Sequence, residues 1–139
     1  MNSVISGGCL CGAVKFSVND SFDDFYFCHC EQCRKVTGSS HASNLLTAID
    51  NIQWLRGHDK VVRFDHPTRM FTKVFCSLCG SGLPHESKNG QCLVVPAGSL
   101  DTEPSKSPNA QIFCSEKVGW FKTDVIKGSI KGSASLIYC

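Results

Sequence analysis

Three cysteines lie within six residues in the stretch Cys28-His29-Cys30-Glu31-Gln32-Cys33-Arg34. Thiolates are soft, charged ligands that suit zinc, and three thiols so close in sequence can converge on one ion with little loss of chain entropy. Three is one fewer than the four ligands that close a tetrahedral structural zinc site. The stretch therefore either takes a fourth ligand from elsewhere or leaves one position open for chemistry.

Two further cysteine pairs have spacings typical of metal-binding turns. Cys9 and Cys11 form a C-x-C pair flanked by glycines, which let the backbone turn tightly around an ion. Cys76 and Cys79 form a C-x-x-C pair followed by Gly80, the usual form of a zinc knuckle, in which backbone amides can point at the sulfurs. C-x-x-C also serves redox chemistry, but that use favours a helix start after a strand in a βαβ setting, which the sequence does not show.

The simplest partition of these seven cysteines gives one closed and one open zinc site, and so two zinc ions per chain. We call the two sets the four-cysteine cluster, which is Cys9, Cys11, Cys76 and Cys79, and the three-cysteine cluster, which is Cys28, Cys30 and Cys33. The first would join segments more than sixty residues apart and so stabilise the fold. In the alternative partition Cys76 and Cys79 join the three-cysteine cluster, which leaves the first pair with only two thiols.

The remaining cysteines, Cys92, Cys114 and Cys139, are isolated in the sequence. An isolated cysteine is often a small buried hydrophobe, so we expect no metal role for them. Ten cysteines would also suit a disulfide framework. The N-terminus, however, lacks the basic region and apolar run of a signal peptide, and cysteines in a C-x-C pair rarely bridge each other. The sequence therefore favours zinc.

Histidines and basic residues near the three-cysteine cluster have several possible roles. His29 lies between two ligands, so its side chain should point away from their ion, toward a neighbouring group or solvent. His41 is the best candidate outside the cluster for a fourth ligand, although solvation is its more usual role. Arg34 and Lys35 could offset the negative charge of the site or hold a substrate carboxylate, or they could form a solvated helix face. Solvation is also expected for His58, His66 and His85.

The composition indicates one globular domain over residues 1–139. Hydrophobic residues make up 42% and charged residues 19%, which allows a core and argues against disorder. A net charge of +2 with scattered Lys and Arg gives no support for a nucleic-acid partner. No apolar segment approaches the roughly 18 residues of a membrane span. We therefore expect a cytoplasmic protein with no membrane partner.

Short strand patterns separated by turns predict a mainly β fold that positions the cysteines. Residues 14–18 alternate apolar and polar side chains with the period of a half-buried strand. The other expected strands are 25–27, 42–49, 52–55, 61–64, 71–75, 92–95, 112–114 and 118–121. A helical turn over 34–38 should end at Gly38, and 100–109 should form an exposed loop. Strands of this length and spacing are typical of a sandwich or barrel-like fold.

With these residues the sequence resembles the glutathione-dependent formaldehyde-activating enzyme family, which also contains centromere protein V. The matching segments are 8–12, 28–34, 37–39 and 75–80, and less sharply 97–101 and 117–121. The resemblance therefore covers a core over 8–121. Members often carry a His-Ile-Phe-like run before the Lys and Trp, whereas this chain has Gln111-Ile112-Phe113.

The resemblance implies an Mss4-like fold of short antiparallel strands around zinc. It also implies a structural zinc ion at the four-cysteine cluster and a catalytic one at the three-cysteine cluster. The activity implied is that of a carbon–sulfur lyase similar to S-(hydroxymethyl)glutathione synthase, with a thiol such as glutathione and an aldehyde such as formaldehyde as small-molecule partners.

The ligand set indicates the same chemistry on physical grounds. Zinc with three thiolates carries a formal charge of −1 (+2 from the ion, −3 from the ligands), so it should activate water poorly. It should instead bind a fourth thiolate from a substrate, and that sulfur can add to an aldehyde carbon. Two alternatives stay open, namely a non-catalytic zinc module that binds a protein partner and a zinc enzyme acting on another small substrate.

Overall fold

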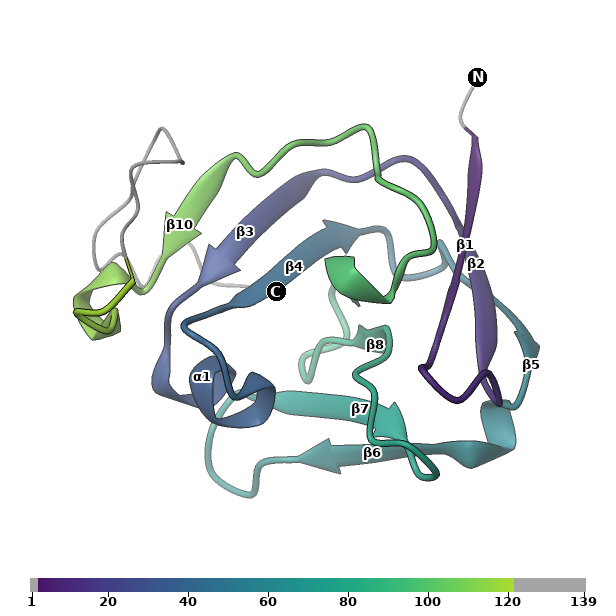
Figure 1. Cartoon of the computed structure of the whole chain (residues 1–139), viewed down its shortest axis with the longest axis horizontal. Helices are drawn as coiled ribbons and strands as arrows, with labels where there is room; N and C mark the ends of the chain where they lie inside the picture. The colour runs from purple at the N-terminus through teal and green to yellow at the C-terminus, as the bar shows by residue number, and fades with distance from the viewer. Residues whose placement is uncertain (1–2, 122–139) are drawn as a thin grey trace.

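The computed structural model describes residues 3–121, in which the chain forms ten short strands and one α-helix (Figure 1). The strands are β1 (Val4–Gly8), β2 (Lys15–Asn19), β3 (Asp24–Cys28), β4 (Ala42–Thr47), β5 (Gln53–Arg56), β6 (Val61–Asp65), β7 (Thr72–Cys76), β8 (His85–Glu86), β9 (Leu93–Pro96) and β10 (Ala110–Ile112). Helix α1 (Glu31–Thr37) connects β3 to β4. None of the helices described is both long and apolar enough to cross a membrane.

The strands form three small sheets, which lie on different sides of the molecule in Figure 1. Their strand orders are β1-β2-β5, β10-β3-β4-β9-β8 and β6-β7. The pairing is antiparallel except at one edge, where β10 runs parallel to β3 with Gln111 opposite Phe27. The prediction of a mainly β fold of short strands is confirmed.

Strand β3 gives the five-stranded sheet two different faces. Successive side chains of a strand point to opposite sides. Tyr26 and Cys28 line a pocket on one side, while Phe25 and Phe27 line another on the other side. The last residue of β3 therefore brings a thiol to the first of these faces.

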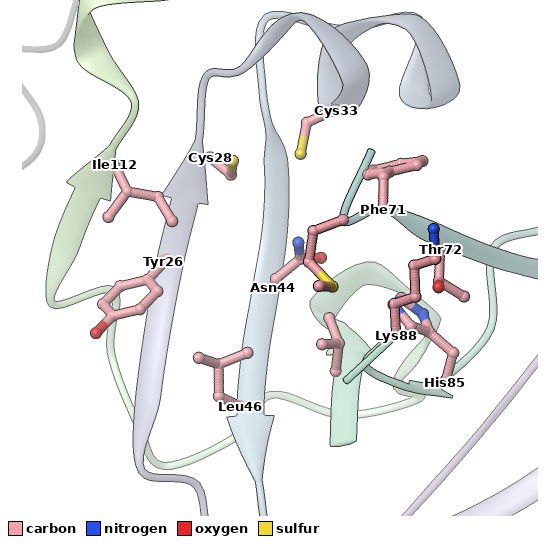
Figure 2. Close-up of a pocket in the computed structure, with 12 residues that line it drawn as sticks. Tyr26, Cys28, Cys33, Asn44, Leu46, Phe71, Thr72, His85, Lys88 and Ile112 are labelled. Carbon is pink, nitrogen blue, oxygen red and sulfur yellow. The ribbon is translucent and has the colours of Figure 1, made fainter. Parts of the chain in front are cut away.

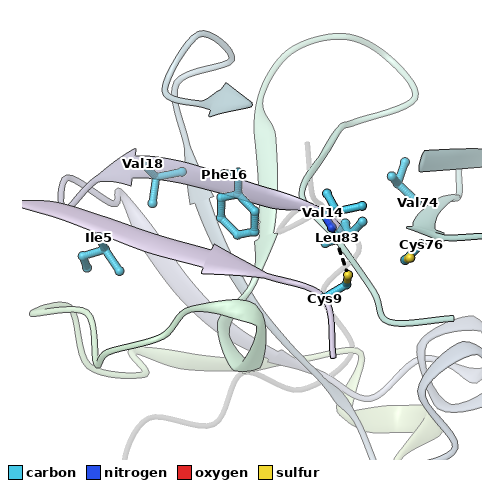
Figure 3. Packing of buried hydrophobic residues seen from close by; sticks show 8 residues of the cluster. All are labelled: Ile5, Cys9, Val14, Phe16, Val18, Val74, Cys76 and Leu83. Carbon is cyan, nitrogen blue, oxygen red and sulfur yellow. Dashed lines mark hydrogen bonds between the residues drawn. The ribbon is translucent and has the colours of Figure 1, made fainter. Parts of the chain in front are cut away.

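The largest buried cluster joins the first sheet to the β6–β7 hairpin (Figure 3). Phe16 and Val14 are fully buried there, and Phe16 packs edge-on against Trp54 with ring centroids 5.9 Å apart. Removing a ring such as that of Phe16 typically costs about 3–5 kcal/mol. Cys9 and Cys76 belong to the same cluster, so the four-cysteine cluster is built directly on this core.

Several local predictions need correction. Helix α1 begins at Glu31, earlier than the expected turn, although it ends as predicted at Gly38, which has a left-handed φ of 66°. Residues 118–121 form no strand and contain a turn instead. The strand expected over 112–114 is β10, which stops at Ile112 because Phe113 has a positive φ of 56° and a 3-10 turn follows.

Strand β1 was not expected from the sequence, because its last two residues are glycines. Gly7 and Gly8 nevertheless pair with β2. A Cβ atom on Gly7 would lie 2.4 Å from the Phe16 ring, and one on Gly8 would lie 2.5 Å from the Val14 carbonyl oxygen. These glycines are therefore needed for close packing, in addition to any role in the turn that follows.

Candidate metal centres

The four-cysteine cluster lies where two tight turns meet. The turn between β1 and β2 carries its first pair; of the second pair, Cys76 ends β7 and Cys79 lies in the turn that follows. The four sulfur atoms all lie within 4.8 Å of one another, and the Sγ atoms of Cys11 and Cys76, from the two segments, are 3.9 Å apart. Gly12 and Gly80 follow the two pairs with φ of 80° and 77°, which residues with a side chain rarely adopt.

Hydrogen-bond donors surround the sulfurs of this cluster. The backbone N–H of Leu78 points at Cys76 Sγ at 3.4 Å, as predicted for a zinc knuckle. The Ser81 hydroxyl lies 3.2 Å from Cys79 Sγ. That hydrogen bond, followed by those from the backbone N–H groups of Cys11 and Ser81, lowers the pKa of Cys79 to about 5. Such donors stabilise the thiolate, which is the form that binds a metal.

The three-cysteine cluster is formed where β3 passes into α1. Cys28 ends β3, Cys30 is the N-cap of α1, and Cys33 lies in its first turn. Their sulfurs lie within 4.8 Å of one another, and their side chains are only 1–4% exposed. The backbone N–H of Cys33 donates to Cys30 Sγ at 3.3 Å, the bond that a Ser or Asp cap would accept. A helix N-terminus also favours negative charge on the sulfur.

The three thiols of this cluster shift one another's pKa through hydrogen bonds. Hydrogen bonds from the Cys28 and Cys33 thiols lower the pKa of Cys30 to about 2, although burial opposes the shift. The Cys33 thiol donates its own proton to the Cys28 and Cys30 sulfurs, which raises the pKa of Cys33, and burial raises it further. One thiolate is thus stabilised by the protons of its neighbours. A divalent cation between the sulfurs would take the place of those protons.

Both clusters could therefore hold a metal ion, and the four-cysteine cluster combines the pairs as the simplest partition predicted. The alternative, with Cys76 and Cys79 beside the three-cysteine cluster, is wrong. Within residues 3–121, no fourth ligand atom from Cys, His, Asp or Glu joins the three-cysteine cluster. Among residues 3–121, the three-cysteine cluster therefore offers three side-chain ligands of these types.

The two histidines near the three-cysteine cluster lie away from its sulfurs. The His41 ring stacks on Phe27, with centroids 4.1 Å apart, and so belongs to the face of β3 opposite Cys28. Hence His41 is not the fourth ligand. His29 is fully buried with Nε2 2.8 Å from Oε1 of Gln111. It therefore points toward a neighbouring group rather than solvent.

The isolated cysteines take no part in either cluster where the structure describes them. Cys92 is buried with Leu46 and Val94, and Cys114 is half-buried. Neither belongs to a group that could hold a metal ion. Cys139 lies outside the described residues.

A small pocket that opens to solvent, with a cavity volume of about 60 Å³, lies beside the three-cysteine cluster (Figure 2). Cys28 and Cys33 contribute to its wall, and apolar side chains such as Phe71 and Ile112 make up much of the rest. Its other polar side chains are Tyr26, Asn44, Thr72, His85 and Lys88. A concave, largely apolar site with a few polar groups is typical of small-molecule binding.

His85 in this pocket differs from the solvated histidine expected from the sequence. Burial lowers its pKa to about 4, and the neighbouring Arg63 and Lys73 charges add to that effect. Its Nδ1 atom is buried with no hydrogen-bond partner among the described residues. The imidazole is therefore neutral near pH 7.

Arg34, the predicted substrate contact, lies on α1 and does not line this pocket. Its Nε atom is buried without a partner in residues 3–121. A role for Arg34 toward a substrate stays a prediction.

Comparison with known proteins identifies one family and one fold. The family model described as glutathione-dependent formaldehyde-activating enzyme matches residues 4–116. The crystal structure of a Rhodobacter sphaeroides protein is similar, with a TM-score of 0.59 and 23% sequence identity, covering 74% of this chain and 97% of that one. At this identity the likeness of the two structures concerns the fold alone.

Proposed function

Because the chain belongs to the glutathione-dependent formaldehyde-activating enzyme family, we propose that it adds a thiol such as glutathione to formaldehyde or a related aldehyde. The thiol sulfur attacks the carbonyl carbon, the C=O π bond opens, and the thiol proton ends on the new hydroxyl oxygen. The reverse reaction breaks the same carbon–sulfur bond, which is lyase chemistry. The observation that carries the proposal is a three-thiol cluster without a fourth ligand in residues 3–121, placed at a pocket.

Zinc is the metal that best suits both clusters. Thiolate-only ligand sets are typical of zinc, and four convergent sulfurs make a closed structural site. The three-cysteine cluster would hold its ion with one position remaining. Zinc bound there would supply a site at which a substrate sulfur is kept deprotonated yet nucleophilic.

The chain's own residues have distinct tasks in this proposal. Cys28, Cys30 and Cys33 hold the ion, and the N-terminus of α1 stabilises their negative charge. Apolar side chains such as Phe71 exclude water from the reacting carbon. His85, neutral because burial lowers its pKa to about 4, can hydrogen-bond an aldehyde oxygen without adding charge to the pocket.

The pocket favours this role over a protein-binding zinc module. A module would use its fourth position for a protein ligand and has no need of a cavity beside the metal. A zinc enzyme acting on another small substrate would use the same cavity, so the assay must separate these two alternatives directly.

The decisive experiment is NMR exchange spectroscopy with ¹³C-formaldehyde and glutathione, because the two also combine without a catalyst. The zinc-loaded protein should accelerate exchange between free formaldehyde and S-hydroxymethylglutathione above the spontaneous rate. The Cys30→Ser variant at the same concentration is the control and should leave the spontaneous rate unchanged. An exchange rate that is the same with and without zinc-loaded protein would refute the proposed function.

A further inference from the structure

Among residues 3–121, Lys88 is the one lysine or arginine in the lining of the pocket beside the three-cysteine cluster, and no Asp or Glu of that range lines it. Asp65 is close enough to interact with Lys88 electrostatically. Its carboxylate, however, is already bound by the Arg63 guanidinium at 3.1 Å and by the Thr72 hydroxyl at 2.6 Å. The pocket thus presents a positive charge that no carboxylate of its own lining neutralises.

Backbone carbonyls hold the Lys88 ammonium in place. Its Nζ donates to the carbonyl oxygen of Arg69 at 2.8 Å and also to that of His66, both in the loop between β6 and β7. An ammonium has three N–H donors, so one is left for a ligand. Carbonyl groups carry no net charge, so they orient the ammonium without cancelling its charge.

The backbone that carries Lys88 is fixed as well. In the turn between β8 and β9, the Ser87 hydroxyl oxygen accepts hydrogen bonds from the backbone N–H groups of Gln91 and Cys92 at 3.1 and 3.2 Å. Gly90 in the same turn has a φ of 73°. Because Lys88 is held at both ends, a ligand that binds its ammonium loses less conformational freedom of the side chain.

We propose that Lys88 binds a carboxylate of the substrate thiol and so makes the pocket selective for thiols that carry one. The inference rests on the function proposed above. In Figure 2, Cys28 and Cys33 lie at the upper end of the pocket and Lys88 lies toward the lower right. A ligand that carries both a thiol and a carboxylate would place its sulfur at the three-cysteine cluster and its carboxylate at Lys88. Glutathione carries both groups.

The test uses cobalt in place of zinc and follows the sulfur-to-metal absorption band during titration with two matched thiols. These are 3-mercaptopropionate and its methyl ester, which differ in the charge of the carboxyl group and by one methyl group. The wild type should bind the acid about 10- to 100-fold more tightly, the range expected for a hydrogen bond to a charged group. Lys88→Met should remove that preference and leave the affinity for the ester unchanged. Lys106→Met, on the opposite face of the sheet, is the control and should keep the preference.

Each result separates the inference from the proposed function. Equal affinity of the wild type for acid and ester would overturn the role of Lys88 while leaving thiol binding intact. Equal weakening of both ligands by Lys88→Met would show that the residue only supports the loop between β6 and β7, and this too would overturn the inference. Retention of the preference in Lys88→Arg, which keeps the charge, would support it. If neither thiol changes the band of the wild type, the proposed function itself fails.

Discussion

The Nε2 atom of His29 lies 2.8 Å from Oε1 of Gln111, and neither side chain is exposed. His29 stands between two members of the three-cysteine cluster, and its backbone N–H donates to the carbonyl oxygen of Ile112 at 3.0 Å. Strand β10 therefore holds the segment between Cys28 and Cys30 through both main chain and side chain. The side-chain part of this link is made by the amide of Gln111.

Loss of this hydrogen bond should weaken both the fold and one metal site. Gln111→Leu would leave the buried His29 ring without its partner, which typically costs about 1–3 kcal/mol of unfolding free energy. The metal affinity of the three-cysteine cluster should fall, and that of the four-cysteine cluster should not change. Denaturant unfolding and cobalt titration measure the two effects. Gln53→Leu, on the exposed face of β5, is the matched control, and equal stability of the two variants would contradict the structural role.

The two clusters should respond differently to loss of one ligand. Cys76→Ser weakens a link across more than sixty residues, for which loop-closure entropy sets an upper limit of about 4 kcal/mol. Cys30→Ser affects ligands that are already neighbours in sequence, so that variant should stay folded but lose activity. Thermal melts of the two variants, together with the exchange assay, test the difference. A Cys30→Ser melt as low as that of Cys76→Ser would argue against this division.

A chelator should remove the two ions in separate steps. The three-cysteine cluster has one protein ligand fewer, so it should lose its ion first, with loss of activity and little change in far-UV circular dichroism. The four-cysteine cluster should release its ion only as the fold is lost. Elemental analysis at increasing chelator concentration follows both steps, and the Cys30→Ser variant should show only the second. Unfolding that accompanies release of the first ion would contradict the assignment.

Stability should fall with acid partly because of His85. Burial lowers the pKa of folded His85 to about 4, whereas an exposed imidazole titrates near 6.5, so the unfolded chain takes up the proton first. The stability that the neutral His85 contributes to the folded state is fully present above pH 6.5 and is lost as the pH falls from 6.5 toward 4. At its limit this amounts to about 3 kcal/mol.

The loss of stability can be followed by measuring the unfolding free energy at several pH values between 7.5 and 5.5. The metal content is checked at each pH. His85→Gln should show a shallower decline than the wild type. His58→Gln, on an exposed turn, is the control and should decline as the wild type does. Parallel curves for the wild type and His85→Gln would refute the assignment of this decline to His85.

Spacing along the chain predicted the three-cysteine cluster and the two cysteine pairs, because the members of each lie close together in a short segment whose geometry is local. The union of the two pairs followed from the ligand count alone, since they lie more than sixty residues apart. Spacing did not predict the pocket, because its polar residues come from distant segments. Asn44 lies on β4 and His85 on β8, and the strand order β4-β9-β8 is what brings them to one sheet. No local pattern encodes that order, and Lys88 in an exposed turn looks like any solvated lysine. The positive φ of Phe113, at which β10 stops, could not be predicted either, because the residue is neither glycine nor asparagine.

The placement of the clusters along the chain also orders events during synthesis, which proceeds from the N-terminus. All ligands of the three-cysteine cluster have emerged once Cys33 has left the ribosome, whereas the four-cysteine cluster must wait for Cys79. In a nascent chain all three thiols of the three-cysteine cluster are thus exposed to cellular metal before the β6–β7 hairpin, which packs in the same buried cluster as Phe16, has been synthesised. The ion expected to be held more weakly in the finished protein is therefore the first for which a full set of protein ligands exists.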